Sequence, residues 1–389
     1  EPALAESEEK ITWGHCAINC PGRCSLKFHV KDDEVVWVDT CTSKDAGFDD
    51  PQPRACLRGR TYRRWMNHPD RINYPMKRVG KRGEGKFEQI SWDEAISTIA
   101  DKLKYTIETY GNEAIYVNYA TGMHSATGNP GKRLLGLLGG YVNQGYDYSA
   151  NMTLAVMPYM YGSSANLDKD GNHVTLGKPA TAFNPYDAVN ASSFSEAEAN
   201  SDLVVMFGNS PAETRMGGAN AVWDFARVRE AVTGRGGKIV NIDYRMNETA
   251  SGHPDEWLPI RPGTDAAVAL AMAYVLVHEE NLIDVDFLTN RTNGPALVDL
   301  ETKRIIRAEG SNKALYMDLS DNAVKPYDEC EKPALEGTFE VDGKTCSTGF
   351  ALYKEHIKTY TPEYAESIST VPAATIRQVA KEYGEAAHI

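Results

Sequence analysis

The 389-residue sequence lacks any apolar run long enough to cross a membrane. Its longest run, residues 266–277, falls short of the roughly 20 residues that a transmembrane helix needs, and it predicts a buried helix. The sequence also lacks an excess of basic residues. Its net charge of −13 argues against a nucleic-acid-binding protein, because phosphates would be repelled. No internal repeat or low-complexity tract is present, so the length predicts two or three globular domains.

The glycine fingerprint of NAD-binding proteins is missing as well. Residues 202–209 and 238–243 predict two buried strands, with a helix expected over 218–232. A strand, a glycine-containing loop, a helix, a strand and a terminal acid, Asp243, is the plan of a dinucleotide-binding βαβ unit. The loop Gly208-Asn209-Ser210-Pro211 does not match G-x-G-x-x-G, so the pattern gives little support for NAD.

Cysteine is scarce, but four of the seven cysteines are grouped. Cys16, Cys20 and Cys24 lie within nine residues and Cys56 follows a loop, which favours an iron–sulfur cluster of the [4Fe-4S] type. Zinc remains an alternative, although its cysteines usually come in two close pairs. Disulfides in an exported protein also remain, although seven cysteines leave one unpaired. Cys41 is interpreted as a bystander.

Further signals extend the α/β pattern along the chain. Ser91 and Glu94 form a capping box that predicts a helix ending at Gly111. The other expected elements are a hairpin over 25–30 and 34–38, a strand over 114–119, a helix from Asp265 to about 277, a turn-rich stretch over 291–349, and two closing helices from Thr361 and over 372–383, the latter with Ile376, Val379, Ala380 and Tyr383 on one stripe.

Basic residues gather in the N-terminal part of this acidic chain. An internal anionic cofactor suits such a cluster better than DNA does. The cluster consists of Arg54, Arg58, Arg60, Arg63, Arg64, Lys77, Arg78, Lys81 and Arg82.

Several motifs together resemble the molybdopterin-dependent dimethyl sulfoxide reductase family, in particular the N-terminal half of its anaerobic catalytic (A) subunits. They are the Cys16/Cys20/Cys24/Cys56 set, CLRGR at 56–60, YPMKRVG at 74–80, GKFEQISWDEA at 85–95, FGNSPAETR at 207–215 and PIRPGTDAA at 259–267. The resemblance implies an α/β protein with a small β-rich iron–sulfur domain (1–88), the first part of a discontinuous α/β domain with the molybdenum-ligand loop (89–195), and an αβα, Rossmann-like dinucleotide-binding domain (196–389).

The resemblance also implies roles for individual residues. Cys16, Cys20, Cys24 and Cys56 match the cluster ligands. Arg58 matches the cation between cluster and pterin, where a fixed charge favours electron transfer. Ser149 matches the molybdenum ligand, a hard oxygen donor, with Asp147 as the rival because other branches use an aspartate.

Two further loops match the binding region for a pterin guanine dinucleotide. The backbone of the first loop can favour phosphate oxygens, and the Asp243 carboxylate can accept hydrogen bonds from ribose hydroxyls or from guanine. Tyr244 stands where relatives commonly have proline, which leaves the shape of that loop open. The matching residues are Gly208, Asn209, Ser210, Glu213, Thr214, Asp243, Arg245, Arg261, Gly263 and Asp265.

The implied enzyme carries molybdenum bis(molybdopterin guanine dinucleotide) and a [4Fe-4S] cluster. It reduces an S-oxide or N-oxide such as dimethyl sulfoxide in anaerobic respiration, with an iron–sulfur subunit and a membrane anchor subunit as partners, in the periplasm. The alternatives are another reaction of the same cofactor, such as reductive dehydroxylation, and a non-catalytic electron-transfer module. Family chains are about twice as long, so we expect a fragment that is inactive alone.

Overall fold

A computed structural model describes most of the chain, in two compact units. The described residues are 8–16, 24–40, 47, 54–118, 130–143, 160, 194–214, 220–311 and 313–387. One unit comprises Glu1–Asp147 with Pro211–Phe225, and the other comprises Tyr148–Ser210 with Ala226–Ile389. The α/β fold class is confirmed, whereas the three-domain division at residues 88 and 195 stays a prediction.

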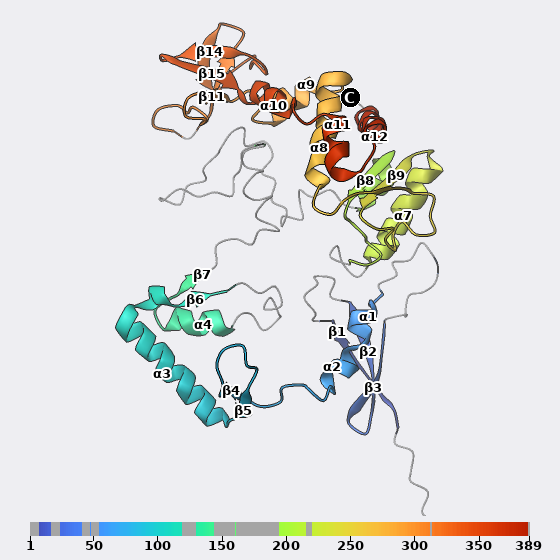
Figure 1. The fold of residues 1–389 in the computed structure, drawn as a ribbon, viewed down its shortest axis with the longest axis vertical. Coiled ribbons are helices and arrows are strands. Elements are labelled where there is room, and N and C mark those ends of the chain that lie inside the picture. Colours follow the sequence, from blue (N-terminus) through green and yellow to red (C-terminus); the bar gives the residue numbers. More distant parts are fainter. Residues whose placement is uncertain are drawn as a thin grey trace, which may run out of the picture. The chain divides into compact units, whose positions relative to one another are not determined.

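The first unit begins with a small antiparallel sheet in the order β1-β2-β3 (Figure 1). Its strands are β1 (Lys10–His15), β2 (Ser25–Lys31) and β3 (Glu34–Thr40). The predicted hairpin is confirmed: Asp32 and Asp33 both adopt positive φ angles, as a tight two-residue turn requires. Leu26 of β2 and Val38 of β3 are buried in one apolar cluster with Cys16 and Cys24.

Helices, short strands and a 3-10 turn follow in this unit. They are α1 (Leu57–Arg60), α2 (Tyr62–Met66), the hairpin of β4 (Met76–Arg78) and β5 (Phe87–Gln89), α3 (Trp92–Tyr110), the 3-10 turn η1 (Asn112–Ala114), β6 (Tyr116–Val117), α4 (Pro130–Leu137) and β7 (Val142–Asn143). The Ser91 cap is confirmed, since its Oγ accepts from the Glu94 amide at 3.1 Å. The strand expected over 114–119 is shorter, because a 3-10 turn occupies its start.

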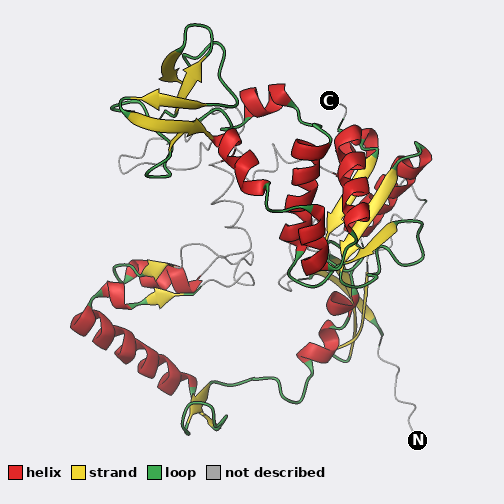
Figure 2. Ribbon diagram, turned by 45° about the horizontal axis from the view of Figure 1, so that its top comes forward, coloured by secondary structure: helices red, strands yellow, loops and turns green. Residues whose placement is uncertain are grey.

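The second unit contains a parallel sheet in the order β10-β9-β8. Its strands are β8 (Leu203–Phe207), β9 (Lys238–Asp243) and β10 (Glu256–Pro259), and the helices around it include α6 (Phe194–Asn200) and α7 (Ala221–Gly234). The predicted βαβ unit is therefore present, and β9 has the predicted bounds. Figures 1 and 2 show α7 and the later helices α8 and α12 on opposite sides of these strands.

The main core of this unit joins the sheet to helices from the end of the chain. These are α8 (Asp265–Tyr274), continued by the π-helix η4 (Val275–Glu279), α11 (Pro362–Ser369) and α12 (Ala373–Ala386). Val240 and Ile242 of β9 lie in one cluster with Ile376 and Val379 of α12. Tyr383, predicted on the same buried stripe, is 52 % exposed instead.

The stretch over 291–349, predicted as broken and turn-rich, forms a small β-rich region. Its elements, with the flanking helices, are α9 (Val285–Arg291), β11 (Leu297–Asp299), β12 (Leu315–Asp318), β13 (Ala323–Pro326), β14 (Thr338–Val341), β15 (Lys344–Thr348) and α10 (Gly349–Ile357). Each strand has only three to five residues. Among the described helices, none has both the length and the apolar character needed to span a bilayer.

Candidate cofactor site

Three loops follow the parallel strands β8, β9 and β10, and they carry most of the residues predicted to bind a dinucleotide. The strands run in parallel and are neighbours, so their carboxyl ends lie at one edge of the sheet. Ligands of open α/β sheets bind at this edge, in the crevice outside the strand ends.

The loop after β8 contains Gly208, Asn209 and Ser210. The Gly208 amide donates to the Ile242 carbonyl at 2.9 Å, which ties the loop to β9. Gly208 has φ of 56° and Ser210 is buried, with its hydroxyl 2.8 Å from the Thr249 hydroxyl. Glu213, in the turn that follows, and Thr214, directly after it, belong to the segment Pro211–Phe225 of the first unit.

The loop after β9 begins with Asp243, which is only 6 % exposed. Its Oδ2 accepts from Asn247 Nδ2 at 2.7 Å, and its Oδ1 accepts from the Arg245 amide at 3.4 Å. Its main-chain carbonyl accepts from the Trp257 indole at 3.0 Å. The carboxylate is therefore oriented by its own loop, and spare lone pairs remain on both oxygens.

Exposed side chains continue this loop. Tyr244 is 60 % exposed, and the Arg245 guanidinium lies over its ring at 5.8 Å from the centroid. The Arg245 Nη1 is also 3.4 Å from Glu248. The position where relatives commonly have proline is thus occupied by an aromatic ring packed on a cation.

The loop after β10 contains Arg261, Gly263 and Asp265. The Arg261 amide donates to the Ser369 carbonyl at 2.9 Å, and the Thr264 hydroxyl donates to the Arg261 carbonyl at 2.6 Å. Gly263 has φ of 78°, and Asp265 opens α8. The hydrogen bond from Thr264 closes the turn, and the bond to Ser369 ties it to α11. The Arg261 side chain is exposed at the sheet edge.

The two loop glycines test whether a dinucleotide fits here. A Cβ placed on Gly208 or on Gly263 would meet no heavy atom of the described residues within 4 Å. Open space therefore lies beside the backbone at both positions, as close approach of a phosphate or sugar would require. The donors, the buried acid and the exposed Arg261 are groups that a pterin dinucleotide would need.

The predicted cluster cysteines lie in the small sheet domain. Cys16 and Cys24 are buried, and the Cys16 amide donates to the Cys24 carbonyl at 2.8 Å. The Cys24 thiol donates to the Arg54 carbonyl at 3.8 Å, just before Cys56. A Cβ on Gly59 would lie 3.5 Å from the Cys16 sulfur. The two flanks of the cysteine triplet and the Cys56 loop therefore meet.

The metal group at these cysteines is predicted from their spacing to be a [4Fe-4S] cluster. In the described part of the chain, no three His, Cys, Asp or Glu side chains are placed to hold one metal ion. The cysteines of a [4Fe-4S] cluster each bind a different iron, so they stand farther apart than zinc ligands do. Cys20, the middle cysteine of the predicted triplet, lies outside the described residues, as does Cys41.

The remaining predicted residues have different outcomes. Arg58 is exposed on α1, two residues after Cys56. Ser149 and its rival Asp147 lie outside the described residues.

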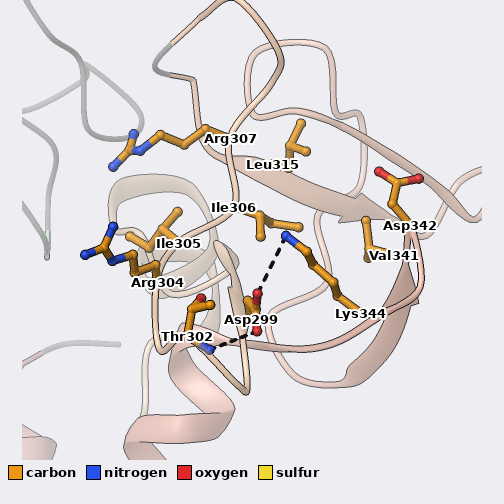
Figure 3. Close-up of a pocket in the computed structure, with 10 residues that line it drawn as sticks. All are labelled: Asp299, Thr302, Arg304, Ile305, Ile306, Arg307, Leu315, Val341, Asp342 and Lys344. Atoms are coloured by element: carbon orange, nitrogen blue, oxygen red, sulfur yellow. Dashed lines mark hydrogen bonds and ion pairs between the residues drawn. The ribbon is translucent and has the colours of Figure 1, made fainter.

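A separate cavity of about 380 Å³ lies in the β-rich region (Figure 3). The Asp299 carboxylate accepts from the amides of Glu301 and Thr302, and it lies 3.7 Å from Lys344 Nζ. The hydrogen bond from Thr302 holds the pKa of Asp299 below its usual value. Figure 3 shows Arg304 and Arg307 extending away from this pair, so the cations do not converge on one ligand position.

Three site residues were missed by sequence reasoning. Asn241, Asn247 and Thr249 are buried beside Asp243 and Ser210. Asn241 was detectable as an amide inside the apolar strand 238–243, where a buried polar group needs partners. Asn247 and Thr249 gave no such signal, since they look like ordinary turn residues.

Comparisons with known proteins identify the family of this chain. Residues 9–68 match the family model described as the molybdopterin oxidoreductase Fe4S4 domain, and residues 71–285 match the molybdopterin oxidoreductase model. The chain is 41 % identical to the putative dimethyl sulfoxide reductase chain YnfE of Escherichia coli over 99 % of its length and 40 % of the relative's. It is 37 % identical to the dimethyl sulfoxide reductase DmsA of the same organism, over 97 % of this chain and 40 % of that protein.

A solved structure shows the same fold. Acetylene hydratase from Pelobacter acetylenicus aligns with a TM-score of 0.52 and 24 % identity, over 95 % of this chain and 38 % of that one. The chain spans about two fifths of the length of these relatives. A matched model that covers more than half of the chain, together with the cysteine domain before it, places this chain in the molybdopterin oxidoreductase family.

Proposed function

We propose that this chain carries the electron entry site and a pterin guanine dinucleotide site of a molybdenum oxidoreductase. The observation that carries the proposal is the meeting of the Gly208, Asp243 and Gly263 loops at the carboxyl edge of β8, β9 and β10. The dinucleotide would be one of two on a single molybdenum. When bound, that cofactor supplies two-electron oxygen-atom chemistry.

The chain's own residues would then have distinct tasks. Cys16, Cys20, Cys24 and Cys56 hold a [4Fe-4S] cluster, Arg58 places a fixed cation next to it, and Ser149, or alternatively Asp147, ligates molybdenum. The dinucleotide is held by the backbone at 208–210, by Glu213, Thr214, Asp243 and Arg245, and by the 261–265 turn.

The acceptor that we propose is an S-oxide or N-oxide such as dimethyl sulfoxide. This choice rests on the relatives named as dimethyl sulfoxide reductases. An iron–sulfur subunit would deliver electrons, a membrane anchor subunit would hold the complex, and the enzyme would work outside the cytoplasmic membrane. A different reaction of the same cofactor is the second candidate, since acetylene hydratase shares the fold.

Metal analysis and spectroscopy of the anaerobically purified chain test the proposal. We expect about four iron atoms per chain, a broad brown absorption band, molybdenum, and guanine nucleotide released on acid hydrolysis. Zinc without iron would reject the cluster, and iron without molybdenum or guanine would favour the electron-transfer module. Reduction of dimethyl sulfoxide and of trimethylamine N-oxide by reduced viologen then tests the acceptor class, and turnover would overturn the expectation that this chain is inactive alone.

A further inference from the structure

Asn247 is a fully buried amide at the centre of the loop after β9, with 0 % exposure. Its Oδ1 accepts from the amides of Thr249 at 3.1 Å and Ala250 at 3.0 Å, and from Asn241 Nδ2 at 3.2 Å. Its Nδ2 donates to Asp243 Oδ2 at 2.7 Å and to Asn241 Oδ1 at 3.4 Å. One side chain thus satisfies backbone, amide and carboxylate partners together.

The shortest of these bonds fixes the Asp243 carboxylate. A hydrogen bond to an ionised acceptor is stronger than one between neutral groups, and burial of both residues excludes competing water. From the described residues, the other oxygen, Oδ1, receives only the long bond from the Arg245 amide at 3.4 Å. Acceptor capacity on the carboxylate therefore remains for a ligand.

The Asn247 side chain is also linked to the loop after β8, through Thr249. The Thr249 hydroxyl lies 2.8 Å from the Ser210 hydroxyl, and its carbonyl accepts from Arg229 Nη2 at 2.6 Å. Arg229 is itself paired with Asp255. Asn247 therefore holds the acid of one loop in register with the polar end of the neighbouring loop.

We infer that Asn247 is a positioning residue that orients the Asp243 carboxylate toward the guanine edge of a bound nucleotide. The inference rests on the proposed function. A guanine edge presents N1–H and an amino group, and both donate to a carboxylate, whereas adenine presents an acceptor at N1. An oriented carboxylate thus selects guanine over adenine, because the wrong base leaves a buried acceptor unpaired.

Asn247→Asp is the most informative variant. It keeps an oxygen that can accept from the Thr249 and Ala250 amides, but it replaces the donor to Asp243 with a second carboxylate oxygen. Asn290→Asp is the matched control. Asn290 Nδ2 donates to Asp286 Oδ1 at the same 2.7 Å, on the exposed helix α9 outside the site.

Titration calorimetry of the 389-residue chain with guanosine and adenosine 5′-monophosphate tests the inference. We expect the unmodified chain to bind the guanine nucleotide more tightly, and Asn247→Asp to weaken guanine binding by about tenfold or more while adenine binding changes less than about twofold. Asn290→Asp should match the unmodified chain.

The outcomes distinguish a failure of the Asn247 inference from a failure of the proposed function. Equal losses of affinity for both nucleotides would show that Asn247 only stabilises the loop. No loss of affinity for either nucleotide would also overturn the inference. Both outcomes would leave the proposed function in place. If the unmodified chain neither binds guanosine monophosphate nor carries guanine nucleotide after purification, the proposed dinucleotide site itself is wrong.

Discussion

Arg229 and Asp255 form a bidentate ion pair next to the loops of the candidate site. Arg229 Nε donates to Oδ1 at 3.1 Å and Nη2 donates to Oδ2 at 2.7 Å, and the Asp255 side chain is 0 % exposed. Arg229 also donates to the Thr249 carbonyl. Removing either partner would leave a buried charge uncompensated, which is costly in the low-dielectric interior.

Asp255→Ala should therefore lower the free energy of unfolding by about 3–5 kcal/mol, measured by urea denaturation. The control is Lys358→Ala, which removes an exposed pair with Glu355 and should change stability by less than about 0.5 kcal/mol. Similar effects in the two variants would mean that the Arg229 pair is not energetically buried.

The ion pairs of Lys238 make the stability of the chain depend on pH. It lies 2.5 Å from Glu256 and 2.8 Å from Glu382, and so joins β9 to β10 and α12. Burial raises the pKa of Glu382, but the hydrogen bonds from Lys238 and Gln378, together with the positive charge of Lys238, outweigh burial and hold the pKa of Glu382 below 4.5. An acid with a lowered pKa stabilises the folded chain above its unfolded pKa, and this contribution is lost as the pH falls through the folded value.

Glu382→Gln should accordingly flatten the fall in stability from about pH 5 downward, in urea titrations repeated at several pH values. The loss at pH 7 should stay within about 1 kcal/mol because roughly a third of each side chain is exposed. Glu385→Gln, at an exposed position of the same helix, is the control and should change stability at pH 7 by less than about 0.5 kcal/mol.

Gly237 is required by a close backbone approach at the start of β9. A Cβ there would lie 2.2 Å from the Asp202 carbonyl oxygen, which accepts from the Lys238 amide. Gly237→Ala should cost about 1–3 kcal/mol because the β8–β9 pairing must shift. Gly234→Ala, with no heavy atom near its Cβ, should change stability by less than about 1 kcal/mol in the same urea experiment.

Cys56→Ser should remove iron from the purified chain and weaken the low-temperature electron paramagnetic resonance signal of the reduced cluster, because serine is a poor replacement for a thiolate ligand. Cys330→Ser is the control, since this half-buried cysteine lies in the β-rich region of the other unit and should leave the iron content unchanged. Full iron retention in Cys56→Ser would reject Cys56 as a ligand.

Asp318 should govern the acid stability of the β-rich region. Lys325 donates to its carboxylate, as do the amides of Glu331 and Lys332, and these contacts hold the pKa of Asp318 far below its usual value. Stability from this acid is present above the unfolded pKa near 3.8 and is lost as the pH falls further. Asp318→Asn should lower the urea midpoint at pH 7 more than Asp321→Asn does, although both acids contact Lys325.

The sequence was most informative where local signals decide the structure. The Ser91 cap and the apolar run 238–243 were sufficient to predict α3 and β9 because both depend on neighbouring residues. The strands over 297–348 were missed, since β11 pairs with β15 across about 50 residues and each strand is too short to show a period.

The same distinction holds for the candidate site. Asp243 was predictable as an acid at the end of a strand, but its pairing with Asn247 depends on how the loop turns, which no spacing encodes. The family resemblance predicted which loops bind the cofactor, and the structure added the hydrogen bonds between their side chains.

The core that joins β9 to α12 has a consequence for biosynthesis. Lys238 and Glu382 are 144 residues apart, and the apolar cluster around Val240 also needs Ile376 and Val379. On the ribosome, β9, the central strand at the candidate site, must therefore remain without one of its covering helices until α12 has been translated. That interval exposes apolar surface in a slow-forming parallel sheet, so we expect the nascent chain to be prone to aggregation until α12 covers it.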